Sequence, residues 1–303
     1  MLDYLFLLLT LLLAFLALRM CSKAFSQRNI LSLVFGLLLS GFVFLYGAWV
    51  YLSVYIKFIF ALGVLLCLIF GLLKGSRKPA WNLGSRPIIL GILIALGILF
   101  DVSYFTGIRF SGVPTVELGF PLGKGNYFVL QGGKGLPSNI FHYTSRGSDY
   151  AMDLVKLDPF GRRCRGVFSN RLQDYFIYGD TIYCPCDGKV LRAVRDNPDN
   201  KPPERKRGPH NLNGVLIESP DYFVFLGHLQ PRQVFVQAGQ IVHLGQPLGL
   251  VGNSGMSLEP HLHIQVHQKL NDSLSWYRHP QLFIHFNGKG YLLFETFHSE
   301  KHP

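Results

Sequence analysis

Charged residues and histidines are scarce in the first third of this 303-residue chain. Residues 1–108 contain eight Lys/Arg, two Asp/Glu and no His, whereas residues 109–303 contain 21 Lys/Arg, 16 Asp/Glu and all eleven His. Hydrophobic residues make up 49% of the chain and charged residues only 16%, which excludes a disordered protein. The uneven distribution excludes one homogeneous globular domain. We therefore expect a lipid-embedded domain, 1–108, and a soluble domain, 109–303.

Long apolar runs fill the first of these domains. A bilayer is crossed by about 20 apolar residues in a helix. The runs therefore predict four α-helical spans at about residues 2–18, 30–52, 55–73 and 87–108, with a tight turn near Ser53–Lys57. No basic residue precedes the first run, so we expect a permanent span rather than a cleaved signal peptide.

The basic residues of this domain predict its orientation. They gather in segments 19–29 and 74–86, while the turn between them has only Lys57. By the positive-inside rule both segments face the cytoplasm, which places residues 109–303 on the extracytoplasmic side. Lys57 and Asp101 lie toward span ends, which disfavours the alternative of a small transporter or channel with an accessory domain.

The soluble domain alternates short apolar stretches with turn residues. This pattern predicts a mostly antiparallel all-β domain without amphipathic helices longer than about two turns. The clearest candidate strands are Gly188–Val194, Gly214–Glu218, Tyr222–Leu229, Gln233–Val236 and His261–His267.

Segment 196–214 departs from the strand pattern because it is rich in proline and charge. We interpret its basic triplet, Arg205–Arg207, as part of a solvated loop, and we expect no nucleic-acid partner. We expect Cys164, Cys184 and Cys186 to be buried thiols, with one disulfide from Cys164 as the open alternative.

The stretch His261–His267 has the strongest chemical signal. On a strand, alternate side chains share a face. His261, His263, Gln265 and His267 therefore face one side, and Leu262, Ile264 and Val266 enter the core. Two imidazoles at this spacing suit a metal and its neighbour better than burial, which would require a partner for each ring.

The flanking segments carry a family resemblance. The glycine-rich stretch Gly245–Gly255 leads into Glu259–His263, and upstream lie Phe225–Leu229, Val236–Val242 and Cys184–Val190. Together they resemble the lysostaphin-type (LytM-like) zinc metallopeptidases, which cut peptide cross-links of bacterial cell walls. The resemblance covers about residues 114–268 and implies the β fold of those peptidases.

The resemblance also implies a set of site residues. His263 resembles the zinc ligand of the His-x-His pair, and His228 and His261 resemble the catalytic histidines. The family's usual His-x-x-x-Asp is absent, but residues 141–154 resemble a variant with a longer loop. This variant assigns His142 and Asp153 as the other zinc ligands, with Asp149 as the competing carboxylate. Three such ligands leave a fourth position open, which is typical of a catalytic Zn²⁺ site.

The implied protein is a zinc metalloendopeptidase anchored in the bacterial cytoplasmic membrane. Its expected substrates are stem or cross-bridge peptides of peptidoglycan, and a protein substrate stays open. The spans are expected to tether the enzyme in the lipid bilayer and to dock a membrane protein partner. The alternative is a non-catalytic LytM-like scaffold that binds or activates another cell-wall hydrolase.

The other residues near the pattern receive supporting or solvent-exposed assignments. Gln265 is expected to support a ligand imidazole, and His267 to lie at the surface or beside the ligands. Gly252, Asn253 and Gly255 are interpreted as turn residues without chemistry. The remaining histidines are expected to be exposed: His210, His243, His279, His285, His298 and His302.

Overall fold

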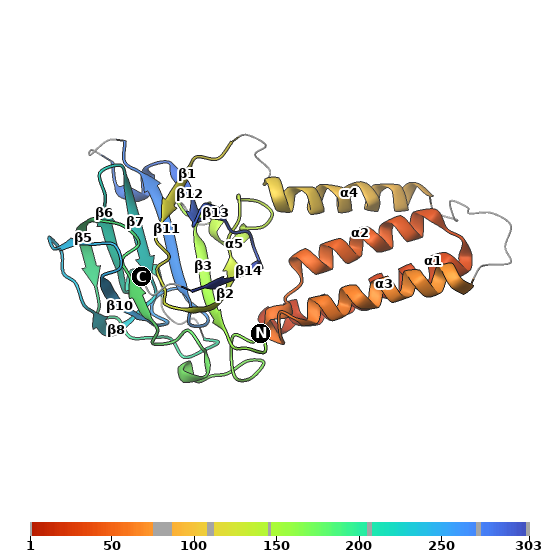
Figure 1. Ribbon diagram of the computed structural model, residues 1–303, viewed down its shortest axis with the longest axis horizontal. Coiled ribbons are helices and arrows are strands. Elements are labelled where there is room, and N and C mark those ends of the chain that lie inside the picture. The colour runs from red at the N-terminus through yellow and green to blue at the C-terminus, as the bar shows by residue number, and fades with distance from the viewer. Residues whose placement is uncertain are drawn as a thin grey trace. The chain divides into compact units, whose positions relative to one another are not determined.

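The computed structural model describes residues 2–74, 87–107, 112–144, 147–204, 208–270 and 274–300. It divides into two compact units, Met1–Phe105 and Thr106–Pro303 (Figure 1). The basic residues predicted to set the orientation at 75–86, the triplet Arg205–Arg207 and His302 lie outside the described residues.

Four apolar helices occur in the N-terminal region. They are α1 (Leu2–Gln27), α2 (Ile30–Tyr46), α3 (Ile56–Lys74) and α4 (Pro87–Thr106). Three segments are long and apolar enough to cross a membrane: Tyr4–Phe25 within α1, α3 and α4. Helix α2 has only 17 residues. The residues that the structure describes therefore contain three candidate spans, and the predicted fourth is not confirmed.

Segment 19–29 was predicted to be a loop, and this was wrong for most of its length. Helix α1 continues to Gln27, so Arg19 and Lys23 lie on the helix. The physical reason is packing, because Cys21 and Ala24 are fully buried and extend the inward stripe of α1 beyond Leu18. Helix α1 packs against both α2 and α3.

The second predicted span, 30–52, is also wrong at its end. Helix α2 ends at Tyr46 and is followed by a 3₁₀ turn at Trp49–Tyr51. Two side chains stabilise this end. The Trp49 indole N–H donates to the Val43 carbonyl at 2.9 Å, and the Ala48 amide donates to the Thr10 hydroxyl at 3.0 Å. These local bonds compete with continuation of the helix.

The second unit is a mostly antiparallel β domain, as predicted. Its strands are β1 (Thr115–Leu118), β2 (Gly125–Gln131), β3 (Met152–Leu157), β4 (Thr181–Tyr183), β5 (Gly188–Val194), β6 (Gly214–Glu218), β7 (Tyr222–Gly227), β8 (Leu229–Val234), β9 (Ile241–Val242), β10 (Pro247–Val251), β11 (Leu262–Gln268), β12 (Gln281–Phe286), β13 (Lys289–Gly290) and β14 (Thr296–Ser299). The helical elements that the structure describes in this unit are α5 (Ile140–Tyr143) and short 3₁₀ turns at Leu172–Asp174, Pro209–Asn211 and Trp276–Arg278.

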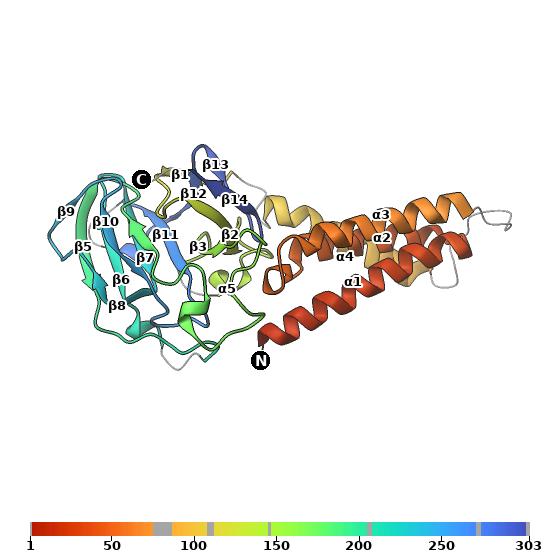
Figure 2. The ribbon, with the colours of Figure 1, turned by 60° about the horizontal axis from the view of Figure 1, so that its bottom comes forward.

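The strands form two sheets. The large sheet has the order β14-β2-β3-β11-β7-β6-β5-β9, with β1, β12 and β13 joined through β11, and the small sheet has the order β4-β10-β8. Strands β5, β6 and β7 lie side by side in both views (Figure 1, Figure 2). Among the described strands, β1 and β12 form the parallel pair. The central position of β11 places its residues between β3 and β7.

The two sheets share one hydrophobic core. It contains Ile182 of β4 and Leu248 of β10 from the small sheet together with Ile217 of β6 from the large sheet, all fully buried. Leu262, Ile264 and Val266 of β11 belong to the same cluster, which confirms the alternation predicted for this strand. Shortening such a buried aliphatic side chain to alanine costs about 2–5 kcal/mol.

The cysteines of the β domain are free and buried. The Cys184 thiol donates to the Cys186 carbonyl at 2.9 Å. The expected buried thiols are therefore confirmed, and the alternative disulfide from Cys164 is not formed.

Candidate metal centre

Asp153 and His263 face each other across two adjacent strands. Asp153 is the second residue of β3, and the antiparallel register pairs it directly with His263 of β11. Opposite side chains in such a pair have Cβ atoms about 4.5–5.5 Å apart. As a result, His263 Nδ1 lies 2.9 Å from Asp153 Oδ1.

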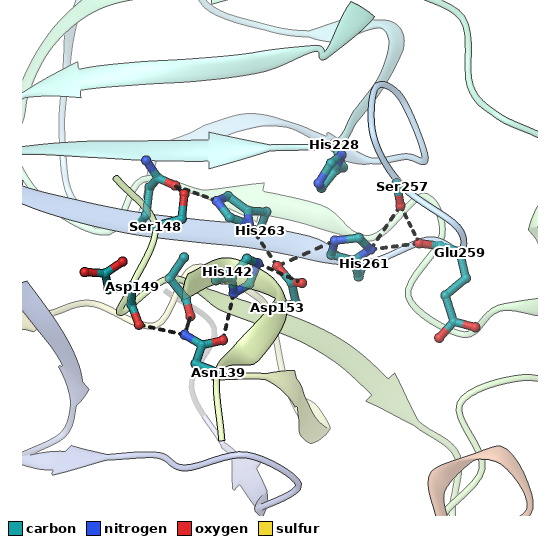
Figure 3. A network of polar contacts seen from close by, with 12 residues as sticks. Asn139, His142, Ser148, Asp149, Asp153, His228, Ser257, Glu259, His261 and His263 are labelled. Carbon is teal, nitrogen blue, oxygen red and sulfur yellow. Dashed lines mark hydrogen bonds and ion pairs between the residues drawn. The ribbon is translucent and has the colours of Figure 1, made fainter. Parts of the chain in front are cut away.

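His142 reaches the same carboxylate from the one-turn helix α5. Its Nε2 lies 3.2 Å from Asp153 Oδ2 (Figure 3). One donor atom from each of His142, Asp153 and His263 lies within 4.8 Å of the other two. Zn²⁺ bonds of about 2.0–2.2 Å place tetrahedral donor atoms about 3.3–3.6 Å apart. The two nitrogens and one oxygen therefore fit the first three positions of a zinc site.

Asp149, the competing carboxylate, is not part of this group. It contributes its backbone instead, since the Asp149 carbonyl accepts from Asn139 Nδ2 at 3.0 Å (Figure 3). The structure thus brings together the three residues predicted as ligands and leaves the Asp149 side chain outside.

Asn139 orients His142, a role that was not predicted from the sequence. Its Nδ2 donates to the carbonyls of Asp149 and Ala151 at 3.0 and 2.9 Å. Because carbonyl oxygens only accept, the other amide atom, Oδ1, must face the His142 ring, and it lies 3.0 Å from Nδ1. His142 Nδ1 then carries a proton, and Nε2 is the ring atom that faces Asp153. Asn139 directly precedes α5, where an Asn resembles an ordinary helix cap, so its position alone did not reveal this role.

His261 and His228 lie beside the three candidate ligands, as predicted. Their ring centroids are 4.5 Å apart, and His261 Nε2 lies 3.6 Å from Asp153 Oδ1. His261 Nδ1 lies 2.8 Å from the Glu259 carbonyl, and His228 Nδ1 lies 2.7 Å from the Ser254 carbonyl. Each Nδ1 therefore donates to a carbonyl, and in the neutral ring Nε2 is left as a proton acceptor.

The turn before β11 holds His228 in place. His228 sits between β7 and β8 with φ 65°, a left-handed conformation that is costly for a non-glycine residue. The Gly252 amide donates to the His228 carbonyl at 2.9 Å, and a Cβ on Gly252 would meet the backbone of Gln230 at 2.5 Å. The interpretation of Gly252 as a plain turn residue was therefore incomplete, since this turn positions a candidate catalytic ring.

A buried ion pair supports the start of β11. Arg163 is 1% exposed and binds both carboxylate oxygens of Glu259 at 2.7 Å. The Glu259 carbonyl is the group that accepts from His261 Nδ1. Such a pair requires fixed geometry, because removing two charges from water is costly. The partners are 96 positions apart in the sequence, and no sequence signal indicated the contact.

Burial and charge act in opposite directions on the ligands. Burial raises the pKa of the Asp153 carboxyl. The charges of His142 and His261 act against burial, as do hydrogen bonds from His142 and His263, and together they hold this pKa well below 3.8. Burial lowers the pKa of His263, but the hydrogen bond and charge of Asp153 raise it overall. The pKa of His228 is lowered well below 6.5, first by burial and then by the charges of His261 and His263. His228 is therefore neutral at pH 7.

The other histidines follow the sequence expectation only in part. His267 was predicted at the surface or beside the ligands, and its full burial excludes the surface. His279 was predicted to be exposed, and it is 3% exposed because it packs on Phe223. His210, His243 and His298 are exposed as expected, whereas His285 is half-buried.

Residues 173–274 match the family model for peptidase family M23. This segment therefore resembles an M23 peptidase domain. The matched segment includes His228, His261 and His263, while His142 and Asp153 precede it. The structure thus adds two candidate ligands that the family match does not reach.

A curated relative of this chain is an uncharacterized metalloprotease from Haemophilus influenzae. The two are 24% identical over 208 residues, which make up 63% of this chain and 40% of the relative. The chain therefore spans less than half of that relative's length.

Solved structures with similarity to the M23 domain include two catalytic domains. One is from the prophage-encoded M23 protein EnpA of Enterococcus faecalis, with 16% identity and a TM-score of 0.30, covering 51% of this chain and 87% of that one. The other is from the antimicrobial peptidase lysostaphin of Staphylococcus simulans, with 18% identity and a TM-score of 0.26, covering 52% and 84%.

Proposed function

We propose that this protein is a membrane-anchored zinc metalloendopeptidase that hydrolyses stem or cross-bridge peptides of peptidoglycan. The observation that carries the proposal is the convergence of His142, Asp153 and His263 beside two further histidines with inward Nε2 atoms. Three ligands of nitrogen and oxygen type leave a fourth coordination position open, which distinguishes catalytic from structural zinc sites.

The chain's own residues would perform the proton transfers of hydrolysis. A bound zinc would supply Lewis-acid chemistry, polarising the scissile carbonyl and lowering the pKa of a water to about 7. The Nε2 atoms of His228 and His261 lie within the same site, so one ring can accept a proton from the attacking water. That proton then passes to the nitrogen of the leaving amine as the peptide bond breaks.

The location of the substrate rests on the apolar helices. Three candidate spans support an anchor in a membrane. The four basic residues of segment 74–86 support a cytoplasmic location for that segment, and α4 would then cross to the other side. We propose that the M23 domain lies on the extracytoplasmic side of a bacterial cytoplasmic membrane. Peptidoglycan peptides are the abundant peptide substrate on that side.

The test is hydrolysis of purified peptidoglycan by the detergent-solubilised full chain, followed as the release of free amino groups. His228→Ala keeps all three candidate ligands, so we expect retained zinc and hydrolysis reduced by about 10²–10⁴-fold. The exposed His243 provides the control, His243→Ala, which should leave hydrolysis unchanged. A wild-type chain that holds zinc and cleaves no wall peptide would contradict the proposal and favour a non-catalytic scaffold.

A further inference from the structure

Gln265 connects His263 to a buried polar chain that the proposed hydrolysis does not use. Gln265 is 6% exposed, and its Oε1 lies 2.8 Å from His263 Nε2. On its other side, Gln265 Nε2 lies 3.3 Å from His267 Nε2, and His267 Nδ1 lies 2.8 Å from the His279 carbonyl. A buried side-chain amide can adopt two orientations related by a 180° flip. The one that gives its neighbours their hydrogen-bond partners is favoured.

The His279 carbonyl sets the direction of every bond in this chain. A carbonyl oxygen only accepts, so His267 Nδ1 carries the proton, and the Nε2 of the neutral ring is an acceptor. Burial lowers the pKa of His267, in agreement with a neutral ring. The group of Gln265 that faces His267 must then be its NH₂, and Oε1 must face His263.

Two further contacts favour the same orientation of the amide. The Ser148 hydroxyl donates to Gln265 Oε1 at 3.2 Å, and the Gly147 carbonyl lies 3.4 Å from Gln265 Nε2. An amide flipped by 180° would turn Oε1 toward two acceptors, the Gly147 carbonyl and His267 Nε2. These contacts therefore favour the orientation with Oε1 toward His263 Nε2.

We infer that Gln265 and His267 are positioning residues that keep a proton on His263 Nε2 and so leave Nδ1, the ring atom that faces Asp153, as the atom that would bind the metal. Asn139 has the corresponding role for His142, where two carbonyls fix the amide directly. For His263 the constraint passes through a second imidazole. The inference rests on the proposed zinc site, because it states how one ligand of that site is oriented.

The experiment measures zinc affinity of the full chain in detergent by competition with a chelator. Gln265→Leu removes the acceptor for His263 Nε2–H, and we expect a 10–100-fold weaker zinc affinity, roughly the effect of losing such a supporting contact. Gln265→Glu retains an acceptor toward His263 and Ser148 and should recover most of the affinity. Gln268→Leu, at an exposed position on the same strand, is the matched control and should bind as wild type does.

A second readout needs no metal. Ring-nitrogen NMR of the metal-free chain labelled with ¹⁵N-histidine should show a hydrogen-bonded proton on His263 Nε2, which Gln265→Leu removes. His267→Phe should weaken this signal and lower zinc affinity by less than Gln265→Leu does, since Ser148 and Gly147 still contact the amide. The His267→Phe variant also tests the inference if Gln265→Leu does not fold.

The outcomes separate the inference from the proposed function. Unchanged zinc affinity and an unchanged His263 Nε2 proton in Gln265→Leu would overturn the inference while the zinc site stands. A wild-type chain that binds no zinc but shows the proton and its loss in Gln265→Leu would support the inference and contradict the proposed function.

Discussion

His263 and Asp153 belong to adjacent strands inside the large sheet, whereas His142 belongs to a single helical turn at its surface. The strand residues are fixed by the β3–β11 register and by the buried Arg163–Glu259 pair at the start of β11. The neighbours of His142 in α5, Ile140 and Phe141, are 50% and 48% exposed. The strand side of the centre is therefore held by the core, and the helix side depends mainly on one amide, that of Asn139.

The largest expected effect comes from the carboxylate that both sides share. Asp153→Asn keeps the shape but removes the charge that contacts His142 and His263. We expect loss of bound zinc and a fall in hydrolysis by more than about 10³-fold, as for other groups required in the transition state. Metal analysis and the peptidoglycan assay measure both. Asp149→Asn is the matched control, and an equal loss there would show that the carboxylate was assigned to the wrong residue.

The buried ion pair should dominate the stability of the strand side. Arg163→Met leaves Glu259 buried without its partner, and we expect a loss of about 3–5 kcal/mol in the free energy of unfolding. The adjacent Arg162 pairs with Asp158, but its side chain is 43% exposed, so Arg162→Met should cost only about 0–1 kcal/mol. Denaturant titration of the full chain compares the two. Equal losses would mean that burial does not distinguish these neighbouring arginines.

We expect Asn139 to affect zinc affinity and to have little effect on the strand side of the centre. Asn139→Leu removes the oxygen that orients His142, and we expect zinc affinity to fall by about 10–100-fold. Chelator competition measures this change, with Asn170→Leu at an exposed position as control. If affinity stays at the wild-type level, His142 does not depend on Asn139, and the contrast between the two sides fails.

The smallest expected effect is on the pH dependence of the free energy of unfolding. Since the pKa of His228 is lowered well below 6.5, its folded ring is neutral, while the unfolded chain takes up a proton as pH falls through 6.5. The stability that the neutral ring contributes is complete above pH 6.5 and is lost below it, with a slope of at most about 1.4 kcal/mol per pH unit. Metal-free His228→Phe should therefore lose less stability between pH 7 and pH 5 than metal-free wild type.

His263 contributes with the opposite sign, because its pKa is raised. Its contribution is present below pH 6.5 and is lost as pH rises through its folded pKa, so it does not produce the acid-side loss expected for His228. Parallel stability curves for wild type and His228→Phe would contradict the prediction.

The facing of the β11 side chains could be predicted from sequence, because alternation sets which side chains of a strand share a face. The choice of His142, Asp153 and His263 as ligands came instead from the family resemblance. Strands β5 and β6 have the bounds that the pattern predicted, and β11 differs by one residue at each end. Periodicity cannot reveal which distant residue fills a buried position, so Arg163 and Asn139 were missed and His279 was placed wrongly at the surface.

The helical region was predicted less well for a related reason. Apolar content identifies helices that suit a membrane, but it does not determine where tertiary contacts end them. Helix α1 extends past Leu18 because Cys21 and Ala24 are buried, and α2 stops at Tyr46 because Trp49 binds the carbonyl of Val43. Neither contact has a local sequence signal.

The account depends on one group of donor atoms holding one metal ion. Zinc-edge X-ray absorption of the full chain, purified with about one zinc per chain, tests this directly. The account predicts a shell of nitrogen and oxygen donors at about 2.0–2.2 Å with scattering from two imidazoles. A sulfur shell at about 2.3 Å, or a chain that retains its zinc after Asp153→Asn, would contradict it.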